Sequence, residues 1–115
     1  MRREVNTKFY TVRQINSGGY YIKNNDVAEY VIVEAIDLQH ALSRLDVILE
    51  NYRSYCPCCG ERWNDYYLKE EDGYKEPRVW GKTLGEFKSW QKDAQAIIHY
   101  LDSTKYVCNL ENEKR

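Results

Sequence analysis

The residues best suited to chemistry lie in one short run, where three of the four cysteines of this 115-residue chain fall within four positions. The run covers residues 55–63 and reads YCPCCGERW. Two thiolates in a Cys-Pro-x-Cys-Gly turn converge on one point, which is the arrangement of half a zinc ribbon. Cys56 and Cys59 are therefore predicted to bind a structural Zn²⁺, with Gly60 allowing the backbone to curl around the ion.

The remaining zinc ligands must come from elsewhere, because the sequence has no second Cys-x-x-Cys pair. Cys108 and His99 are the main candidates, since they lie on the two arms of a predicted hairpin and share a face if it turns through residues 102–103. A turn that is one residue longer would place His99 on the opposite face. Two further residues carry suitable donor atoms: Cys58 and His40. The alternative is that the thiols bind no metal and Cys108 packs in the core.

Catalytic readings of the cysteine run are weak. A thioredoxin-like Cys-x-x-Cys opens a helix after a strand, whereas this run follows a predicted helix. Zinc deaminases need a His-x-Glu ahead of their cysteines, and the only upstream histidine, His40, is followed by Ala-Leu. The sequence also has no glycine-rich phosphate loop, nucleophile elbow or metalloprotease helix. We therefore expect a protein that is not an enzyme.

Aromatic and basic side chains form the second constellation. The chain has eleven tyrosines against two phenylalanines, and tyrosine is favoured where a protein contacts a partner or a base. Aromatic faces beside guanidinium groups suit stacked bases and phosphates. The candidate ligand-binding residues are Tyr20, Tyr21, Arg62, Trp63, Arg78, Trp80 and Lys82. The alternative is ordinary packing of large side chains around a small core.

The charges argue against one class of binding site. The formal net charge is −1, which argues against a long nucleic-acid groove because such binding is mostly electrostatic. A small nucleotide or a protein partner fits better. The N-terminus has no apolar signal-peptide region, and no stretch reaches the roughly 18 apolar residues of a membrane span, so we expect a soluble intracellular protein with reduced cysteines.

The first half of the chain predicts a sheet covered by one helix. Residues 8–15 and 20–23 read as a hairpin around the turn at 16–19, and residues 27–35 read as a buried strand. Asp37 is a predicted N-cap for a helix over 38–51. An apolar stripe recurs along this helix at spacings of three and four: Leu38, Ala41, Leu42, Leu45, Ile48, Leu49 and Tyr52.

The second half predicts shorter elements. Residues 64–77 read as a mobile excursion or loose hairpin, residues 78–81 as an edge strand, and residues 83–90 as a short helix with a capping box. Residues 96–101 and 105–110 read as a closing hairpin, followed by a charged, frayed tail over 111–115. The predicted fold class is α+β, one domain over residues 1–115. It has an antiparallel sheet of about five strands, one main helix and a Cys-rich turn that joins the helix end to later segments.

Four segments carry a resemblance to a known group of proteins. They are FYTVRQINSGGY at 9–20, VAEYVIVEA at 27–35, YCPCCGERW at 55–63 and IIHYLD at 97–102. With these strings the chain resembles an uncharacterised family of small bacteriophage proteins. This family has no assigned activity, and the resemblance therefore implies no catalytic residue.

The resemblance implies a role in the host cytoplasm. Many small phage proteins of unknown function act against host defences, so the expected function is a non-enzymatic inhibitor of a bacterial antiphage system. It would sequester a small nucleotide signal or block a host immune effector protein. No membrane partner is expected, and the chain alone does not decide whether the protein forms a homo-oligomer. The alternative is a zinc-knuckle adaptor that binds nucleic acid or a replication protein.

Overall fold

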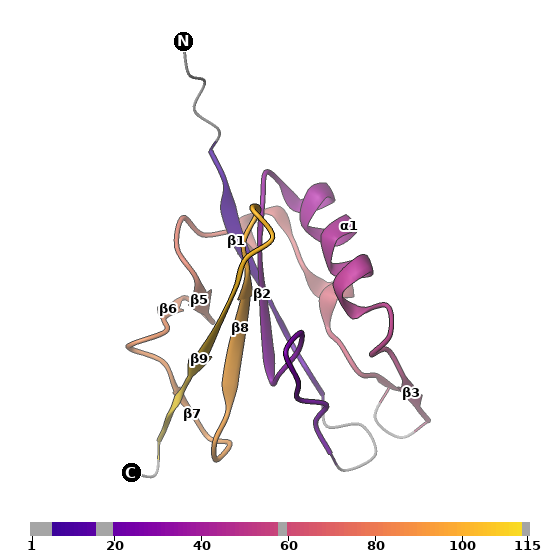
Figure 1. Cartoon of the computed structure of the whole chain (residues 1–115), viewed down its shortest axis with the longest axis vertical. Helices are drawn as coiled ribbons and strands as arrows, with labels where there is room; N and C mark the ends of the chain where they lie inside the picture. Colours follow the sequence, from indigo (N-terminus) through magenta and orange to yellow (C-terminus); the bar gives the residue numbers. More distant parts are fainter. Residues whose placement is uncertain (1–5, 16–19, 58–59, 114–115) are drawn as a thin grey trace.

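A central sheet separates one helix from a set of short strands (Figure 1). The computed structural model describes residues 6–15, 20–57 and 60–113. The main sheet has the strand order β1-β2-β8-β9, with α1 on one face and the β5–β7 region on the other. The four strands are β1 (Lys8–Arg13), β2 (Tyr30–Ala35), β8 (Gln95–His99) and β9 (Lys105–Asn109).

The predicted α+β class is confirmed, but the prediction of an antiparallel sheet of about five strands is wrong in detail. The main sheet has four strands and is mixed, because β2 and β8 run parallel from Tyr30↔Ala96 to Val33↔His99. Parallel neighbours require a crossover connection, and here α1 and the whole segment up to residue 94 provide it. The closing hairpin was predicted correctly as β8 and β9, which are antiparallel.

The predicted returning strand over residues 20–23 is wrong. Strand β1 pairs directly with β2 instead. The buried side chain of Gln14 makes hydrogen bonds to main-chain groups that a returning strand would have paired. Its Nε2 donates to the carbonyls of Ile22 and Ala28, and its Oε1 accepts from the N–H of Ile22. These bonds satisfy main-chain groups that a hairpin would otherwise have paired. The predicted turn at 16–19 lies outside the described residues.

Helix α1 (Leu38–Leu49) forms as predicted and ends two residues earlier than expected. Asp37 caps it by accepting from the N–H of His40 at 2.9 Å. Ala41, Leu45 and Leu49 are fully buried against the sheet, whereas Leu42 is only half-buried at the edge of the stripe. The core on this face also contains Tyr10, Val12, Val31, Val33 and Trp63.

The other face of the sheet carries a second core beneath three short strands. These are β5 (Arg78–Val79), β6 (Lys82–Thr83) and β7 (Lys88–Ser89). The predicted helix over 83–90 is wrong. Glu86 Oε1 accepts from Thr83 N and Thr83 Oγ1, so the capping-box residues close an isolated turn without a helix after it.

Two other predicted irregular regions are ordered. The tail is paired at its start, because β10 (Glu111–Asn112) runs parallel to β7. The segment 64–77 contains two short 3₁₀ helices, η2 (Asp65–Tyr67) and η3 (Glu70–Asp72). It is joined to β1 at both ends, by Asn64 to Arg13 and by Tyr74 to Phe9. Gly73 permits this close approach, since a Cβ there would lie 2.7 Å from the ring of Tyr10.

The cysteine run follows α1 as a small hairpin. Strands β3 (Tyr55–Cys56) and β4 (Gly60–Glu61) are antiparallel, with Cys56 opposite Gly60. In the part of the chain that the structure describes, no helix is long and apolar enough to cross a membrane.

Candidate functional site

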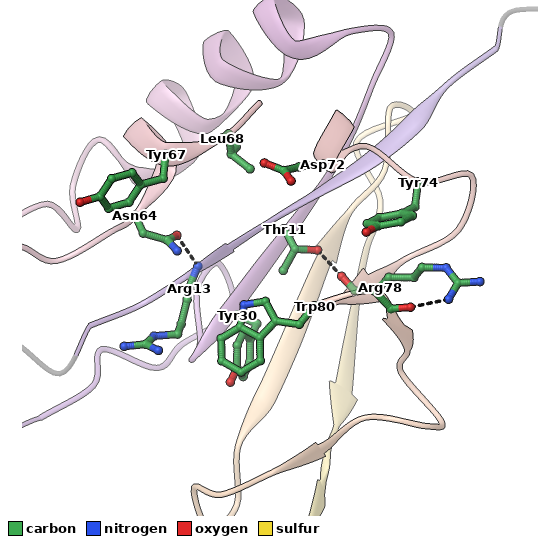
Figure 2. Close-up of a pocket in the computed structure, with 11 residues that line it drawn as sticks. Thr11, Arg13, Tyr30, Asn64, Tyr67, Leu68, Asp72, Tyr74, Arg78 and Trp80 are labelled. Atoms are coloured by element: carbon green, nitrogen blue, oxygen red, sulfur yellow. Dashed lines mark hydrogen bonds between the residues drawn. The ribbon is translucent and has the colours of Figure 1, made fainter. Parts of the chain in front are cut away.

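A cleft of about 230 Å³ lies over the outer edge of β1 and is the candidate site. Figure 2 shows Thr11 and Arg13 on β1, with residues of the 64–72 segment on one side of the strand and the β5–β6 hairpin on the other. The lining residues are Thr11, Arg13, Tyr30, Asn64, Tyr67, Leu68, Asp72, Tyr74, Arg78, Trp80 and Gly81. Four of these eleven are aromatic, two are arginines and one is a carboxylate.

Hydrogen bonds to β1 fix both walls of the cleft. On one side Asn64 Oδ1 accepts from Arg13 N at 2.8 Å, and Asn64 N donates to Arg13 O at 3.3 Å. On the other side Thr11 Oγ1 donates to the carbonyl of Arg78 at 2.5 Å, which holds the β5–β6 hairpin beside the strand. Strand β1 is an edge strand of the main sheet, so these contacts cover an edge that would otherwise be open.

Trp80 is the most unusual residue of the cleft. It occupies the hairpin turn between β5 and β6 with a φ of 50°, and Gly81 follows with a φ of 80°. A two-residue turn with both φ values positive is a type I′ turn, which favours Asn and Gly rather than a bulky side chain. Strained positions of this kind cluster at functional sites. Here the strain presents an indole ring that is 60% exposed at the mouth of the cleft.

The Trp80 ring is held in place by other rings. It makes edge-to-face contacts with Tyr30 at 6.0 Å and with Phe87 at 5.7 Å between centroids. Tyr30 is fully buried, and this burial raises the pKa of its phenol above the ordinary value, so it is a neutral support for the indole. One face of an exposed, supported ring is suited to stacking against a flat ligand.

The two arginines of the cleft differ in their roles. Arg78 lies over the ring of Tyr74 at 5.6 Å and also donates to Gly81 O at 2.7 Å, so it braces the hairpin. Arg13 lies 6.0 Å from the Trp80 ring centroid and, among the described residues, has no carboxylate within ion-pair distance. A guanidinium beside an exposed indole is suited to a ligand that joins a flat ring to an anion.

Of the seven predicted ligand-binding residues, the cleft brings together only Arg78 and Trp80. Lys82 is exposed on β6 opposite Val79 and does not line the cleft. Arg62 and Trp63 are 2% and 1% exposed, so neither presents a surface to a ligand. The sequence predicted both as ligand-binding residues because the type and spacing of an Arg-Trp pair beside a turn do not show whether the two side chains are exposed or buried.

The buried pair has structural roles. Arg62 Nε donates to Ser54 Oγ at 2.7 Å, and its Nη1 donates to Gln14 Oε1 at 3.0 Å. The indole N–H of Trp63 donates to the carbonyl of Tyr52 at 3.1 Å. These bonds tie the segment after the cysteine run to β1 and to the end of α1.

The predicted tyrosines lie apart from the cleft. Tyr20 lies beneath the guanidinium of Arg62, 4.7 Å from the ring centroid. The hydroxyl of Tyr21 accepts from Gln91 Nε2 at 2.8 Å. Neither lines the cleft, and we do not include them in the candidate site.

Sequence reasoning missed most of the cleft. Thr11 and Arg13 were assigned only to a strand, and the segment containing Asn64, Tyr67 and Tyr74 was predicted to be a mobile excursion or a loose hairpin. The paired aromatics Tyr66 and Tyr67, whose ring centroids are 4.4 Å apart, were the one available signal that this segment has a surface role.

The predicted metal ligands Cys108 and His99 lie on opposite faces of the sheet. The register pairs Cys108 with Ala96, and not with Ile97, so Cys108 packs on the second core. His99 pairs with Lys105 on the face of α1, where its Nε2 hydrogen-bonds Asp26 O at 2.7 Å. The prediction that both residues complete one zinc site is therefore wrong, because a one-residue change in register moves a side chain to the other face.

Zinc at the cysteine turn stays a prediction. The described residues contain no group of three or more His, Cys, Asp or Glu side chains that could hold a metal, and Cys58 and Cys59 lie outside them. Of the remaining candidates, His40 uses Nδ1 to accept from the N–H of Ile36. Gly60, which follows Cys58 and Cys59 in the run, has a φ of 84°, a left-handed conformation that glycine adopts without strain.

If Cys56 and Cys59 bind zinc, protein purified without chelator should contain about one Zn²⁺ per chain by elemental analysis. The Cys56→Ser variant should lose the metal and unfold at lower denaturant, while Cys108→Ser should keep its zinc. Metal-free wild-type protein would disprove the site.

A second prediction concerns His99 and pH. Burial of the ring lowers the pKa of His99, the hydrogen bond to Asp26 O opposes this, and the cations Lys105 and Arg44 lower it further. The unfolded chain therefore takes up this proton first, and the free energy of unfolding should fall as pH drops below about 6.5. The slope for one proton is at most about 1.4 kcal/mol per pH unit.

The measurement is urea unfolding between pH 8 and 5. His99→Gln should flatten the profile in this window, because glutamine keeps a donor for Asp26 O and does not titrate. A profile that is the same in both proteins would contradict the assignment.

Comparison with known proteins identifies a family for most of the chain. The family model described as Domain of unknown function (DUF7296) matches residues 7–113, which is most of the chain. No curated protein matches the chain. No solved structure matches it either.

Proposed function

The chain belongs to the DUF7296 family, and from the geometry of the β1 cleft we propose that it is a non-enzymatic protein that binds a nucleotide-derived ligand. The observation that carries the proposal is Trp80, an exposed indole in a left-handed turn beside the guanidinium of Arg13, which has no carboxylate within ion-pair distance among the described residues. A base stacked on the indole and a phosphate near the guanidinium would use both groups at once.

The size of the cleft limits how much ligand it encloses. About 230 Å³ is below the roughly 300–1,000 Å³ of an ordinary small-molecule site. One base with its sugar therefore fits better than a whole dinucleotide. A larger signal molecule would place one base in the cleft and leave the remainder on the surface near Arg13.

The remaining lining groups are suited to recognition. Tyr67 and Tyr74 add aromatic surface at the walls, where their side chains are 69% and 38% exposed. Asp72 Oδ2 already accepts from Lys69 N, which fixes the orientation of the carboxylate. Tyrosine supplies contact area at low cost in conformational entropy, so these walls favour binding.

The resemblance to small bacteriophage proteins suggests a biological use for such binding. A protein that holds a nucleotide-derived immune signal without changing it would inhibit a bacterial antiphage defence in the host cytoplasm. The same exposed aromatic surface could instead cap a host effector protein, since aromatic and arginine side chains also dominate protein interfaces.

The test is ligand capture and release. The purified protein is incubated with cyclic dinucleotides and with ADP-ribose-type signals, desalted and heat-denatured, and the released molecule is identified by mass spectrometry. Intact release of a stoichiometric ligand is the expected result. A chemically altered product would indicate an enzyme, and no retention of any signal would exclude sequestration and leave the effector-binding alternative.

A further inference from the structure

Thr11 lines the β1 cleft, and the pairing of its neighbours on β1 shows which way its main-chain groups point. One residue beyond the Arg13↔Tyr30 pair that ends the β1–β2 ladder, Gln14 N donates to Glu29 O at 2.8 Å, on the side of β1 that faces β2. Phe9 points the other way, because its N donates to Tyr74 O at 2.7 Å on the outer side. Main-chain groups alternate between the two sides of an antiparallel strand. The N–H and C=O of Thr11 therefore point outward, in the same direction as those of Phe9.

The outer edge of β1 is covered on both sides of Thr11. Phe9 is bridged to Tyr74 toward one end, and Arg13 is bonded to Asn64 through both its N–H and its C=O toward the other. Between them, the N–H and C=O of Thr11 have no hydrogen bond to any described residue on this side. One donor and one acceptor are thus left side by side in a lined cleft.

We propose that the main-chain N–H and C=O of Thr11 read the hydrogen-bonding edge of the nucleobase that the cleft takes; this inference rests on the proposed function. An open strand edge offers the same two groups to an added peptide strand. Here both neighbouring positions are occupied, so only one residue's length of edge is free. A peptide strand could not continue, whereas a flat heterocycle with an adjacent donor and acceptor needs no more than this length.

The side chains around Thr11 agree with this orientation. A base whose edge meets the main chain of β1 would lie between the 64–72 wall and the β5–β6 hairpin, with Trp80 at its side (Figure 2). Its sugar and phosphate would then point out of the cleft. A site that uses both groups should reject bases alkylated on that edge by about tenfold or more, because methylation removes a donor and leaves Thr11 O unsatisfied.

The first experiment observes the amide directly. Isotope-labelled protein is titrated with AMP, GMP, CMP and UMP, and main-chain amides are followed by two-dimensional NMR. With at least one nucleotide the Thr11 amide proton should move downfield, together with the amides of Tyr74 and Gly81. The same nucleotide methylated on its hydrogen-bonding edge should bind at least tenfold more weakly.

Two variants isolate the N–H group. Thr11→Pro removes it at a position where an edge strand tolerates proline, and Thr11→Val removes only the hydroxyl. Binding should fall at least tenfold further in the proline variant than in the valine variant. If the proline variant does not fold, the NMR result on the natural protein decides.

The outcomes separate this inference from the proposed function. Shifts at Tyr74 and Gly81 without a shift at Thr11 would overturn the role of Thr11 and leave nucleotide binding intact. Full binding of the methylated nucleotide would do the same. The absence of shifts around the cleft with every nucleotide tested here and every signal tested in the capture experiment would overturn the proposed function itself.

Discussion

Replacing Trp63 by alanine should lower the free energy of unfolding by about 3–5 kcal/mol. The indole is 1% exposed and packs in the core between the sheet and α1, where its removal leaves a large cavity. Its N–H also satisfies Tyr52 O after the end of the helix, and Trp63 forms an antiparallel bridge with Gln14 at the end of β1. The residue therefore joins three parts of the molecule.

Urea unfolding followed by circular dichroism measures this change. Trp90→Ala is the matched control, because that indole is 54% exposed and its removal should cost well under 1 kcal/mol. Trp63→Phe should give an intermediate loss, since it keeps much of the volume but leaves Tyr52 O without its donor. A Trp63→Ala protein as stable as the Trp90→Ala protein would show that Trp63 is not part of the core.

The strongest sequence patterns predicted the elements that build the core. The buried strand at 27–35 and the helix at 38–51 both exist, with slightly shorter bounds, because their apolar spacing is enforced by packing on the sheet. The strand predicted at 20–23 does not form, because the side chain of Gln14, eight residues before Ile22, bonds the main chain of Ile22 in place of a strand ladder. A hydrophobic pattern does not predict such a contact between a side chain and the main chain. The parallel pairing of β2 with β8 is likewise a non-local property.

The residues of the candidate site were harder to predict for a physical reason. Residue type shows that a tryptophan or arginine can stack, but not whether its ring is exposed. Trp63 and Trp80 were therefore equivalent in the sequence, and only the structure places one in the core and the other over the cleft. The prediction that Cys108 and His99 share a face was wrong because the register of the β8–β9 hairpin differs by one residue from the one assumed. A sequence does not determine the register of a hairpin whose turn is long.

The cleft itself could not be seen in the sequence because its walls come from distant segments. Thr11 contacts Arg78 across 67 residues, and Arg13 contacts Asn64 across 51. The β5–β6 hairpin holds Arg78 and Trp80 close in sequence, and this was the local signal behind the two predicted residues that line the cleft. That hairpin carries the residue whose replacement best tests the function.

Replacing Trp80 by asparagine should weaken ligand binding by one to two orders of magnitude while leaving the fold intact. A base stacked on an aromatic side chain gains about 1–3 kcal/mol, and this is lost with the ring. Asparagine is favoured at the first central position of a type I′ turn, so the substitution should relieve the strain at a φ of 50°. This gain offsets the lost ring contacts with Tyr30 and Phe87.

Calorimetric titration with the ligand identified by capture and release measures the effect, and urea unfolding checks the fold. Trp90→Asn is the matched control, because it removes another exposed indole that does not line the cleft. Trp80→Phe should retain part of the affinity, since a smaller ring still stacks. Unchanged affinity in a folded Trp80→Asn protein would contradict the assignment of the cleft. The presence of tryptophan at a φ of 50° would then be explained by the packing of its ring over Phe87.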